Sequence, residues 1–504
     1  MRTEQETKSC GRWSWMVIIL ACLVLSCDIA PLPEPDPEPL RIALHGDPSG
    51  LDPHLQLEVI AQSVLGNIYE TLVTFDVNMG LVPSLAERWE NPDDLTLRLH
   101  LRAGVEFHDG RLLSAADVVD SFERARHHPD SKCSALLVAV EEIRILDPLT
   151  IELRTATHYP ILLNKLTFFY IVPQGAPEAI RRPIGTGPYR FLGFEEDGRL
   201  LLEAFARHWR GPPAAGRVEF FFLSDPRQRL GRLLAGELDL IEELAPQDVE
   251  MVQERPGFRV ESRSGLTVSY LQMNTAIEPF SDPRVRQAVD LAIDREALVA
   301  EALLGQGQPL GQMVTPNVFG YAPQIAVVTQ DAETSRRLLA EAGYGDGLEL
   351  ELEYRAKRSP AVDPLREQLA AVGIRIRPVP RPWSEMYSRL VSGEVPFYFG
   401  GWTNNSGDAS DLLDHKVHTR DALRGYGANN SNRYSHPEID SLIEASATMK
   451  MEQRGEILQQ ALTLLARDRA FIPLYTLYDL YGVREEVAWV PRLDGRVYAF
   501  EMRR

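Results

Sequence analysis

The strongest constraint on the fold is a regular alternation of strands and helices in the second half of the chain. Short apolar runs predict strands at residues 348–354, 374–379 and 396–399. Between them, residues 360–372 and 384–391 have the apolar spacing of helices. Strands that alternate with helices of this length favour βαβ units. We therefore predict an α/β fold with a mainly parallel sheet.

The first half of the chain contains patterns that predict two strands and the start of a helix. Leucines alternate with polar residues from Leu95 to Leu101, and this period of two predicts a half-buried strand. A shorter apolar strand is predicted at residues 40–44. Ser114 and Asp117 have the spacing of a capping box, so a helix is expected to begin there.

The N-terminus has the layout of a secretory signal over residues 1–26. Basic residues precede an apolar run from Trp15 to Leu25, which is followed by Ser26 and Cys27. As a helix this run spans about 17 Å, which is too short for a hydrocarbon layer of about 30 Å. The segment Val24-Leu25-Ser26-Cys27 resembles a bacterial lipobox, which predicts lipidation of Cys27. Simple cleavage and an uncleaved anchor remain alternatives.

Residues 27–39 predict an extended stalk behind the lipidated cysteine. Proline occupies every second position from 31 to 39, which excludes a helix or a central strand. Such a segment adopts polyproline II at about 3.1 Å per residue and acts as a semi-rigid spacer. A disordered tail without function has the same composition. The order of lipid, stalk and folded body predicts attachment to the membrane through a lipid anchor.

The composition excludes some partners. The chain of 504 residues carries 53 Lys and Arg against 72 Asp and Glu, a formal net charge of −19. Phosphates would meet like charge, so nucleic acid is not expected to be a partner. After removal of the signal and acylation of Cys27, only Cys133 remains, and no intramolecular disulfide is expected.

The sequence contains no motif of an enzyme. Nucleophile elbow, P-loop, dinucleotide-binding, zinc-protease and paired C-x-x-C patterns are all absent, so we predict neither catalytic residues nor a cofactor. The best local metal candidate is His415 with His418, because residues three apart share a helical face. Two histidines are weak evidence, and we interpret this stretch as a solvated polar segment without a metal.

Several segments in a fixed order carry a family resemblance. The longest runs from Leu81-Val82-Pro83 through the 95–101 strand to His108-Asp109-Gly110. The others are 51–54, 67–72, 185–191, 273–288, 401–402, 434–440 and 472–474. Together they resemble the ABC-transporter solute-binding proteins for dipeptides, oligopeptides and nickel, known as family 5.

The resemblance implies a two-lobed periplasmic-binding-protein-like clamp with an additional third domain. Lobe I would comprise three separate segments, residues 40–75, 180–262 and 470–504. The additional domain would span residues 76–179, and lobe II would span residues 263–469. Two lobes that are joined by a hinge can close over a ligand.

The resemblance also implies a ligand between the lobes, near the segment that contains Leu51 on one side and the Trp402 loop on the other. In many peptide binders of this family, an aspartate in that loop pairs with the amino group of the ligand. Asn405 occupies this position here, and Asp408 is the nearest carboxylate. A turn-capping role for Asp408 is the alternative.

Further ligand contacts are predicted from charge and aromatic content. Arg355 or Arg358 would bind a ligand carboxylate in bidentate fashion, although an arginine-rich surface is the commoner explanation of such residues. Aromatic residues of the second half line either a pocket or the core. They are Trp402, Tyr475, Tyr478, Tyr481 and Trp489.

We therefore predict a monomeric extracytoplasmic solute-binding lipoprotein. It would capture di- or oligopeptides and deliver them to the permease subunits of an ABC importer. Asp28 resembles the signal that retains lipoproteins in the inner membrane, so the predicted location is the periplasmic or cell-surface face of the cytoplasmic membrane. One alternative is the same clamp for a nickel chelate, an oligosaccharide or an opine, and another is a periplasmic hydrolase.

Overall fold

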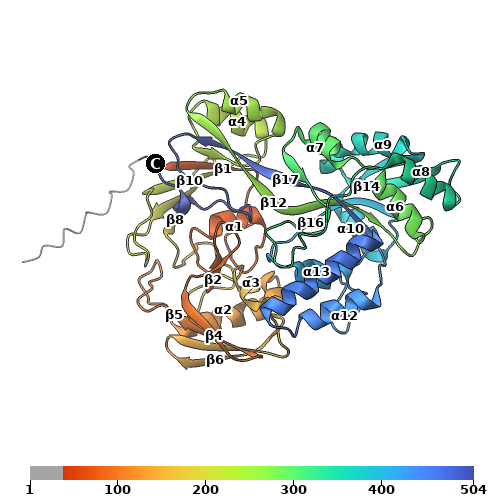
Figure 1. Ribbon diagram of the computed structural model, residues 1–504. Coiled ribbons are helices and arrows are strands. Elements are labelled where there is room, and N and C mark those ends of the chain that lie inside the picture. Colours follow the sequence, from red (N-terminus) through yellow and green to blue (C-terminus); the bar gives the residue numbers. More distant parts are fainter. Residues whose placement is uncertain (1–37) are drawn as a thin grey trace, which may run out of the picture. The chain divides into compact units, whose positions relative to one another are not determined.

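The computed structural model describes residues 38–504, except for the side chains of residues 357–359. Among these residues the largest sheet has eleven strands in the order β15-β14-β16-β12-β17-β11-β1-β10-β9-β8, and β13 pairs with β17 (Figure 1). Its strands are β1 (Leu40–Leu44), β8 (Tyr189–Phe194), β9 (Leu200–Ala204), β10 (Arg217–Phe222), β11 (Leu240–Ile241), β12 (Phe258–Met273), β13 (Gly307–Pro309), β14 (Leu348–Arg355), β15 (Ile374–Arg381), β16 (Phe397–Thr403) and β17 (Phe471–Arg484).

The fold is α/β, as predicted, but the large sheet is mixed. The predicted alternation of strands and helices appears as β14, α9 (Val362–Ala370), β15, α10 (Trp383–Ser392) and β16. β14 pairs in parallel with β15 and β16, and β1 pairs in parallel with β10 and β11. The prediction of a mainly parallel sheet was wrong, because β12, β17, β8 and β9 all pair antiparallel with their neighbours.

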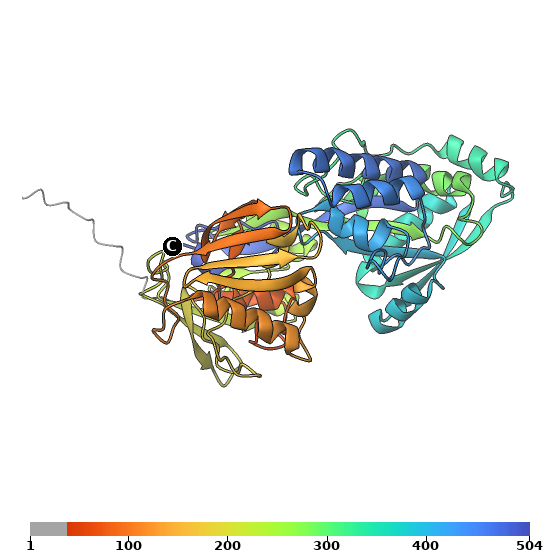
Figure 2. The same ribbon diagram turned by 90° about the horizontal axis from the view of Figure 1, so that it is seen from below.

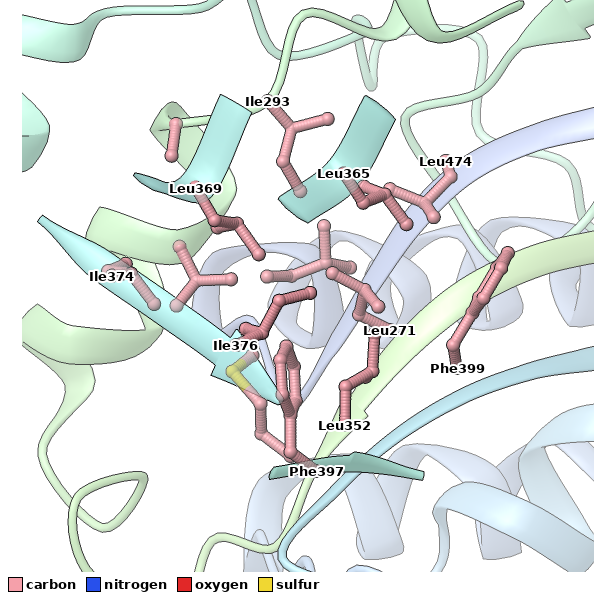
Figure 3. Close-up of a cluster of buried hydrophobic side chains, with 14 of the residues drawn as sticks. Leu271, Ile293, Leu352, Leu365, Leu369, Ile374, Ile376, Phe397, Phe399 and Leu474 are labelled. Carbon is pink, nitrogen blue, oxygen red and sulfur yellow. The ribbon is translucent and has the colours of Figure 1, made fainter. Parts of the chain in front are cut away.

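The strands around β14 form one hydrophobic core, and we call this part lobe II. Helices α6 (Pro283–Leu291), α7 (Arg295–Leu303), α8 (Ala332–Glu341) and α9 pack on these strands. Figure 3 shows Leu365 and Leu369 from α9 in the same cluster of buried side chains as Leu352 and Ile374 from the sheet. Removing each such side chain from water contributes about 1.5–3 kcal/mol, so this core fixes the position of the strand ends.

The strands around β1 form a second core, and we call this part lobe I. Helix α1 (Val59–Leu65) and the segment from Val487 to Met502 pack against β1, β9 and β10. On the other face of this sheet, α4 (Pro226–Leu234) and α5 (Val249–Gln253) cover a smaller apolar cluster. Lobe I is thus built from segments that are far apart in the sequence.

The additional domain has a four-stranded antiparallel sheet of its own, seen as orange strands in Figure 2. The order is β4 (Ala86–Asp93), β5 (Thr96–Leu101), β7 (Thr150–Thr155) and β6 (Val140–Asp147), and α2 (Ala115–His127) packs against it. Leu97, Leu99 and Leu101 are buried, as their alternation predicts. The capping box of α2 is confirmed, since the backbone N–H of Ser114 donates to Asp117 at 2.8 Å.

The remaining elements complete the chain around these cores. A further apolar cluster lies under α11 (Ala409–Leu412), the π-turn η4 (Leu413–Val417), α12 (Pro437–Ser446) and α13 (Met451–Asp468). The short elements are β2 (Val73–Phe75), β3 (Leu81–Pro83), α3 (Leu162–Leu166), η1 (Cys133–Leu137), η2 (Pro246–Asp248), η3 (Ala356–Ala361) and η5 (Ala499–Glu501). No helix within residues 38–504 is long and apolar enough to cross a membrane.

Two long strands, β12 with 16 residues and β17 with 14, belong to both lobes. Residues 258–264 of β12 pair with residues 478–484 of β17 in lobe I, and residues 268–272 pair with residues 471–476 in lobe II. The register shifts between Ser264 and Val268. The molecule is thus a two-lobed clamp with an additional domain, and the exact residue boundaries of its parts stay a prediction.

Candidate functional site

The parallel strands of both lobes run toward the middle of the β12–β17 pair. The C-terminal residue of β16, Thr403, pairs with Thr267 of β12. The C-terminal residue of β11, Ile241, pairs with Gly482 of β17. In open α/β sheets, ligands bind outside the carboxyl ends of the parallel strands. The convergence of these ends on one crossing segment makes it the candidate binding site.

The lobe II edge presents an arginine stacked on an aromatic surface. Arg355 ends β14 and is exposed, and its guanidinium carbon lies 5.0 Å from the centre of the Trp383 ring. Trp383 and Tyr387 are 46% and 48% exposed, with ring centroids 5.6 Å apart. Exposed aromatic side chains beside a guanidinium are suited to bind an organic ligand that carries a carboxylate.

Sequence reasoning missed Trp383 and Tyr387. Both lie on α10 with Val391, four residues apart, and therefore share one helical face. Met386 and Leu390 form the buried face of the same helix. The sequence did contain a signal for them. The helix predicted here has large apolar or aromatic residues on two faces, and only one of these faces can pack into the core.

Trp402, one residue before the end of β16, lies beside a buried lysine. Its indole Nε1 is buried and has no hydrogen-bond partner among the described residues. The ammonium of Lys416 lies 5.8 Å from its ring and 5.2 Å from the ring of Tyr270, and it donates to Gln272 at 2.8 Å. Burial lowers the pKa of Lys416 to about 7.

The loop after Trp402 exposes Asn405 and buries Asp408. Arg454 donates to both carboxylate oxygens of Asp408, at 2.6 and 2.8 Å, and both side chains are almost completely buried. The backbone N–H of Ser410 also donates to Asp408, which caps α11. These contacts are those of the turn-capping role, and both carboxylate oxygens already accept hydrogen bonds from the chain itself.

The remaining predicted contact residues divide into two groups. Leu51 is 6% exposed and belongs to the lobe I core, so its side chain points away from solvent. The Arg358 side chain and Cys27 lie outside the described residues. Three of the aromatic residues are buried in the cores of the two lobes, as the alternative of a core role predicts: Tyr475, Tyr481 and Trp489. Tyr478 is half-buried.

The lobe I edge is rich in carboxylates. Glu242 and Glu243 follow β11, and Glu242 accepts from the backbone N–H of His45 at 2.7 Å. The imidazole Nδ1 of His45 lies 2.5 Å from the same carboxylate. Asp479 lies on β17 close to these groups, and burial together with their negative charge raises its pKa to about 7.

The His415 and His418 stretch is not the solvated segment that we predicted. His418 is buried, its ring stacks on Tyr426 at 4.2 Å, and its Nε2 lies 3.1 Å from Glu444. His418 follows the π-turn and packs against α12, where Asp440 and Glu444 both lie within 4 Å of its ring nitrogens. The part of the chain that the structure describes has no group of three potential metal ligands.

A cavity of about 520 Å³ is lined by other residues than those predicted to bind the ligand. Tyr69 and Glu70, Arg210 and the C-terminal residues Arg492 and Glu501 contribute to its lining. No predicted ligand residue lines it.

Comparison with known proteins identifies the family. The model of the bacterial extracellular solute-binding proteins, family 5 (middle), matches residues 80–423. The chain belongs to this family. It is 28% identical to heme-binding protein A of Haemophilus influenzae over 85% of each chain. It is 30% identical to the probable di/tripeptide-binding protein 5 of Pseudomonas aeruginosa, over 82% of this chain and 86% of the relative.

Solved structures of family 5 proteins have the same fold. HbpA2 from Haemophilus parasuis superposes with a TM-score of 0.83 at 25% identity, over 92% of this chain and 99% of that chain. The resemblance to family 5 and the fold that it implied are therefore confirmed. The two relatives are named for binding heme and di- or tripeptides.

Proposed function

We propose that this family 5 protein captures small peptides outside the cytoplasm and delivers them to the permease subunits of an ABC importer. The observation that carries the proposal is the exposed stack of Arg355 on Trp383 at the lobe II strand ends. A guanidinium pairs with a carboxylate terminus, and neighbouring rings accept varied side chains. A relative that is 30% identical is named for binding di- and tripeptides, which supports the same class of ligand here.

The charge at the two edges also suits a peptide. Arg355 gives the lobe II edge a cation, whereas Glu242, Glu243 and Asp479 give the lobe I edge carboxylates. A peptide has a carboxylate at one end and an ammonium at the other. A zwitterion therefore complements both edges, and a neutral oligosaccharide complements neither.

Replacement of Trp383 tests the proposed surface. We expect Trp383→Ala to lower affinity for a mixed tripeptide pool roughly ten- to a hundredfold, because a central aromatic contact contributes about 1.5–3 kcal/mol. Equilibrium dialysis with mass-spectrometric detection measures the bound peptides. Phe194→Ala is the matched control, since Phe194 is 55% exposed on β8 far along the sheet. Equal losses in both variants would argue against a site at Trp383.

Non-peptide solutes are outcomes of the same experiment. The wild-type protein could fail to bind the tripeptide pool and instead bind a nickel–histidine chelate, heme or an opine. That result would show that its ligand belongs to another class. The alternative of a periplasmic hydrolase predicts that the peptides are cleaved during dialysis. Peptides recovered intact support a binding protein.

We further propose that the protein is a monomeric lipoprotein anchored through Cys27 at the periplasmic or cell-surface face of the cytoplasmic membrane. The lipobox-like segment and the proline-rich residues 27–39 support this proposal. Cys27→Ala is expected to abolish incorporation of labelled fatty acid, while Cys133→Ala leaves it intact because Cys133 is buried in the additional domain. Label that persists in Cys27→Ala would contradict lipidation at this residue.

A further inference from the structure

Several buried carboxylates of the protein are paired with cations, whereas the Asp479 carboxylate is not. Asp408 is paired with Arg454, Asp290 with Arg295 and Asp52 with Arg124. The Asp479 carboxylate, in contrast, forms no hydrogen bond or ion pair with any residue that the structure describes. A part-buried carboxylate without a partner is costly, so its environment favours a positive charge from outside the chain.

The position of Asp479 is the middle of the crossing segment. It pairs across the strands with Arg263 of β12 and lies between the ends of β16 and β11. Arg263 does not neutralise it, because its guanidinium donates to the side chain of Asn78 and to the backbone carbonyl of Val77. Asp479 is thus located where the strand ends of both lobes converge.

The groups around Asp479 add negative charge. Glu242 and Glu243 come from the end of β11, and Asp494 comes from the C-terminal segment. Asp494 is neutralised by Arg492, and Glu242 is contacted by His45. Gly265 leaves room beside the carboxylate, since a Cβ there would lie 3.3 Å from Asp479 Oδ2.

We propose that Asp479 binds the ammonium group of the ligand, in place of the loop position occupied by Asn405. This inference rests on the proposed function and narrows it to solutes with a free amine. Three observations support this assignment. Asn405 carries no charge, and Asp408 forms an ion pair with Arg454. Asp479 has no such partner and lies where the strand ends converge. The ammonium would bind at lobe I, and the carboxylate would bind at Arg355 of lobe II.

The experiment compares two peptide pools on the purified full-length protein. One pool contains mixed tripeptides with free amines, and the other contains the same tripeptides after N-acetylation. We expect wild type to bind the free-amine pool at least about tenfold more tightly, because a charge-assisted hydrogen bond contributes about one to two factors of ten. Asp479→Asn should lower affinity for the free amines about ten- to a hundredfold and remove the discrimination.

Asp414→Asn is the matched control. Asp414 has a pKa that burial likewise raises to about 7, but it lies on η4 close to Lys165 and Arg454 rather than at the strand ends. This variant should keep both affinity and discrimination. Asp479→Ser, whose side chain is neutral and smaller, serves as the second variant if Asp479→Asn does not fold.

The outcomes separate the inference from the proposed function. Discrimination that survives in both Asp479 variants overturns the role of Asp479 and leaves peptide capture intact. Equal binding of the two pools by wild type also overturns the inference alone. Binding of neither pool by wild type overturns the proposed function, and the inference falls with it.

Discussion

Arg454→Met is expected to lower the free energy of unfolding by about 3–5 kcal/mol, because it leaves the Asp408 carboxylate buried without a cation. Asp408 is 2% exposed and accepts from both terminal nitrogens of Arg454. Urea unfolding at pH 8, monitored by circular dichroism, measures the loss. The pair holds α13 against the start of α11, so the loop after Trp402 should also become less ordered.

Two variants make this result specific. Asp408→Asn combined with Arg454→Met should recover much of the lost stability, since neither charge then remains buried. Arg337→Met breaks an exposed pair with Glu341 and should change stability by less than about 0.5 kcal/mol. If Asp408→Asn kept its stability and lost only peptide binding, the ligand role considered for Asp408 would be correct.

Lys416→Met is expected to raise the free energy of unfolding by about 2–4 kcal/mol at pH 7. The folded protein holds the pKa of Lys416 at about 7 against an ordinary 10.5, with burial as the cause. As the pH falls below about 10, the unfolded chain takes up a proton that the folded protein takes up only near pH 7. Wild-type stability is therefore lost as the pH falls through this window, at up to about 1.4 kcal/mol per pH unit.

The measurement is the difference in unfolding free energy between Lys416→Met and wild type at pH 7, 8 and 9. This difference should be largest at pH 7 and shrink toward pH 9. Contacts of the ammonium with Tyr270 and Phe471 and its bond to Gln272 offset part of the gain. Lys132→Met, at an exposed position, should show no such trend. A difference that is constant with pH would contradict a shifted pKa.

The local elements of the fold could be predicted because their signals are local. The alternation of leucines in β5 and the spacing of Ser114 and Asp117 each depend on fewer than ten residues. The order and direction of the strands could not be predicted in this way. β12 pairs with β17 across roughly two hundred residues, and nothing in either apolar run specifies an antiparallel partner.

The site was predictable only in part, for the same reason. The resemblance located the Trp402 loop, but the partner of Asp408 is Arg454, 46 residues further along the chain. A sequence-based prediction cannot tell a free carboxylate from one that a distant arginine neutralises. Asp479 was missed because it lies in a largely apolar and aromatic strand. A single acidic residue in such a strand is normally interpreted as a position that faces solvent.

The shared strands also determine how the molecule can come apart. β12 and β17 supply backbone hydrogen bonds to lobe I on one side of the register shift and to lobe II on the other. A protease cut that released one lobe would strip a central strand from the sheet of the other and expose its amide groups. We therefore expect neither half to be stable as a separate fragment, and we expect both to melt together in one calorimetric transition.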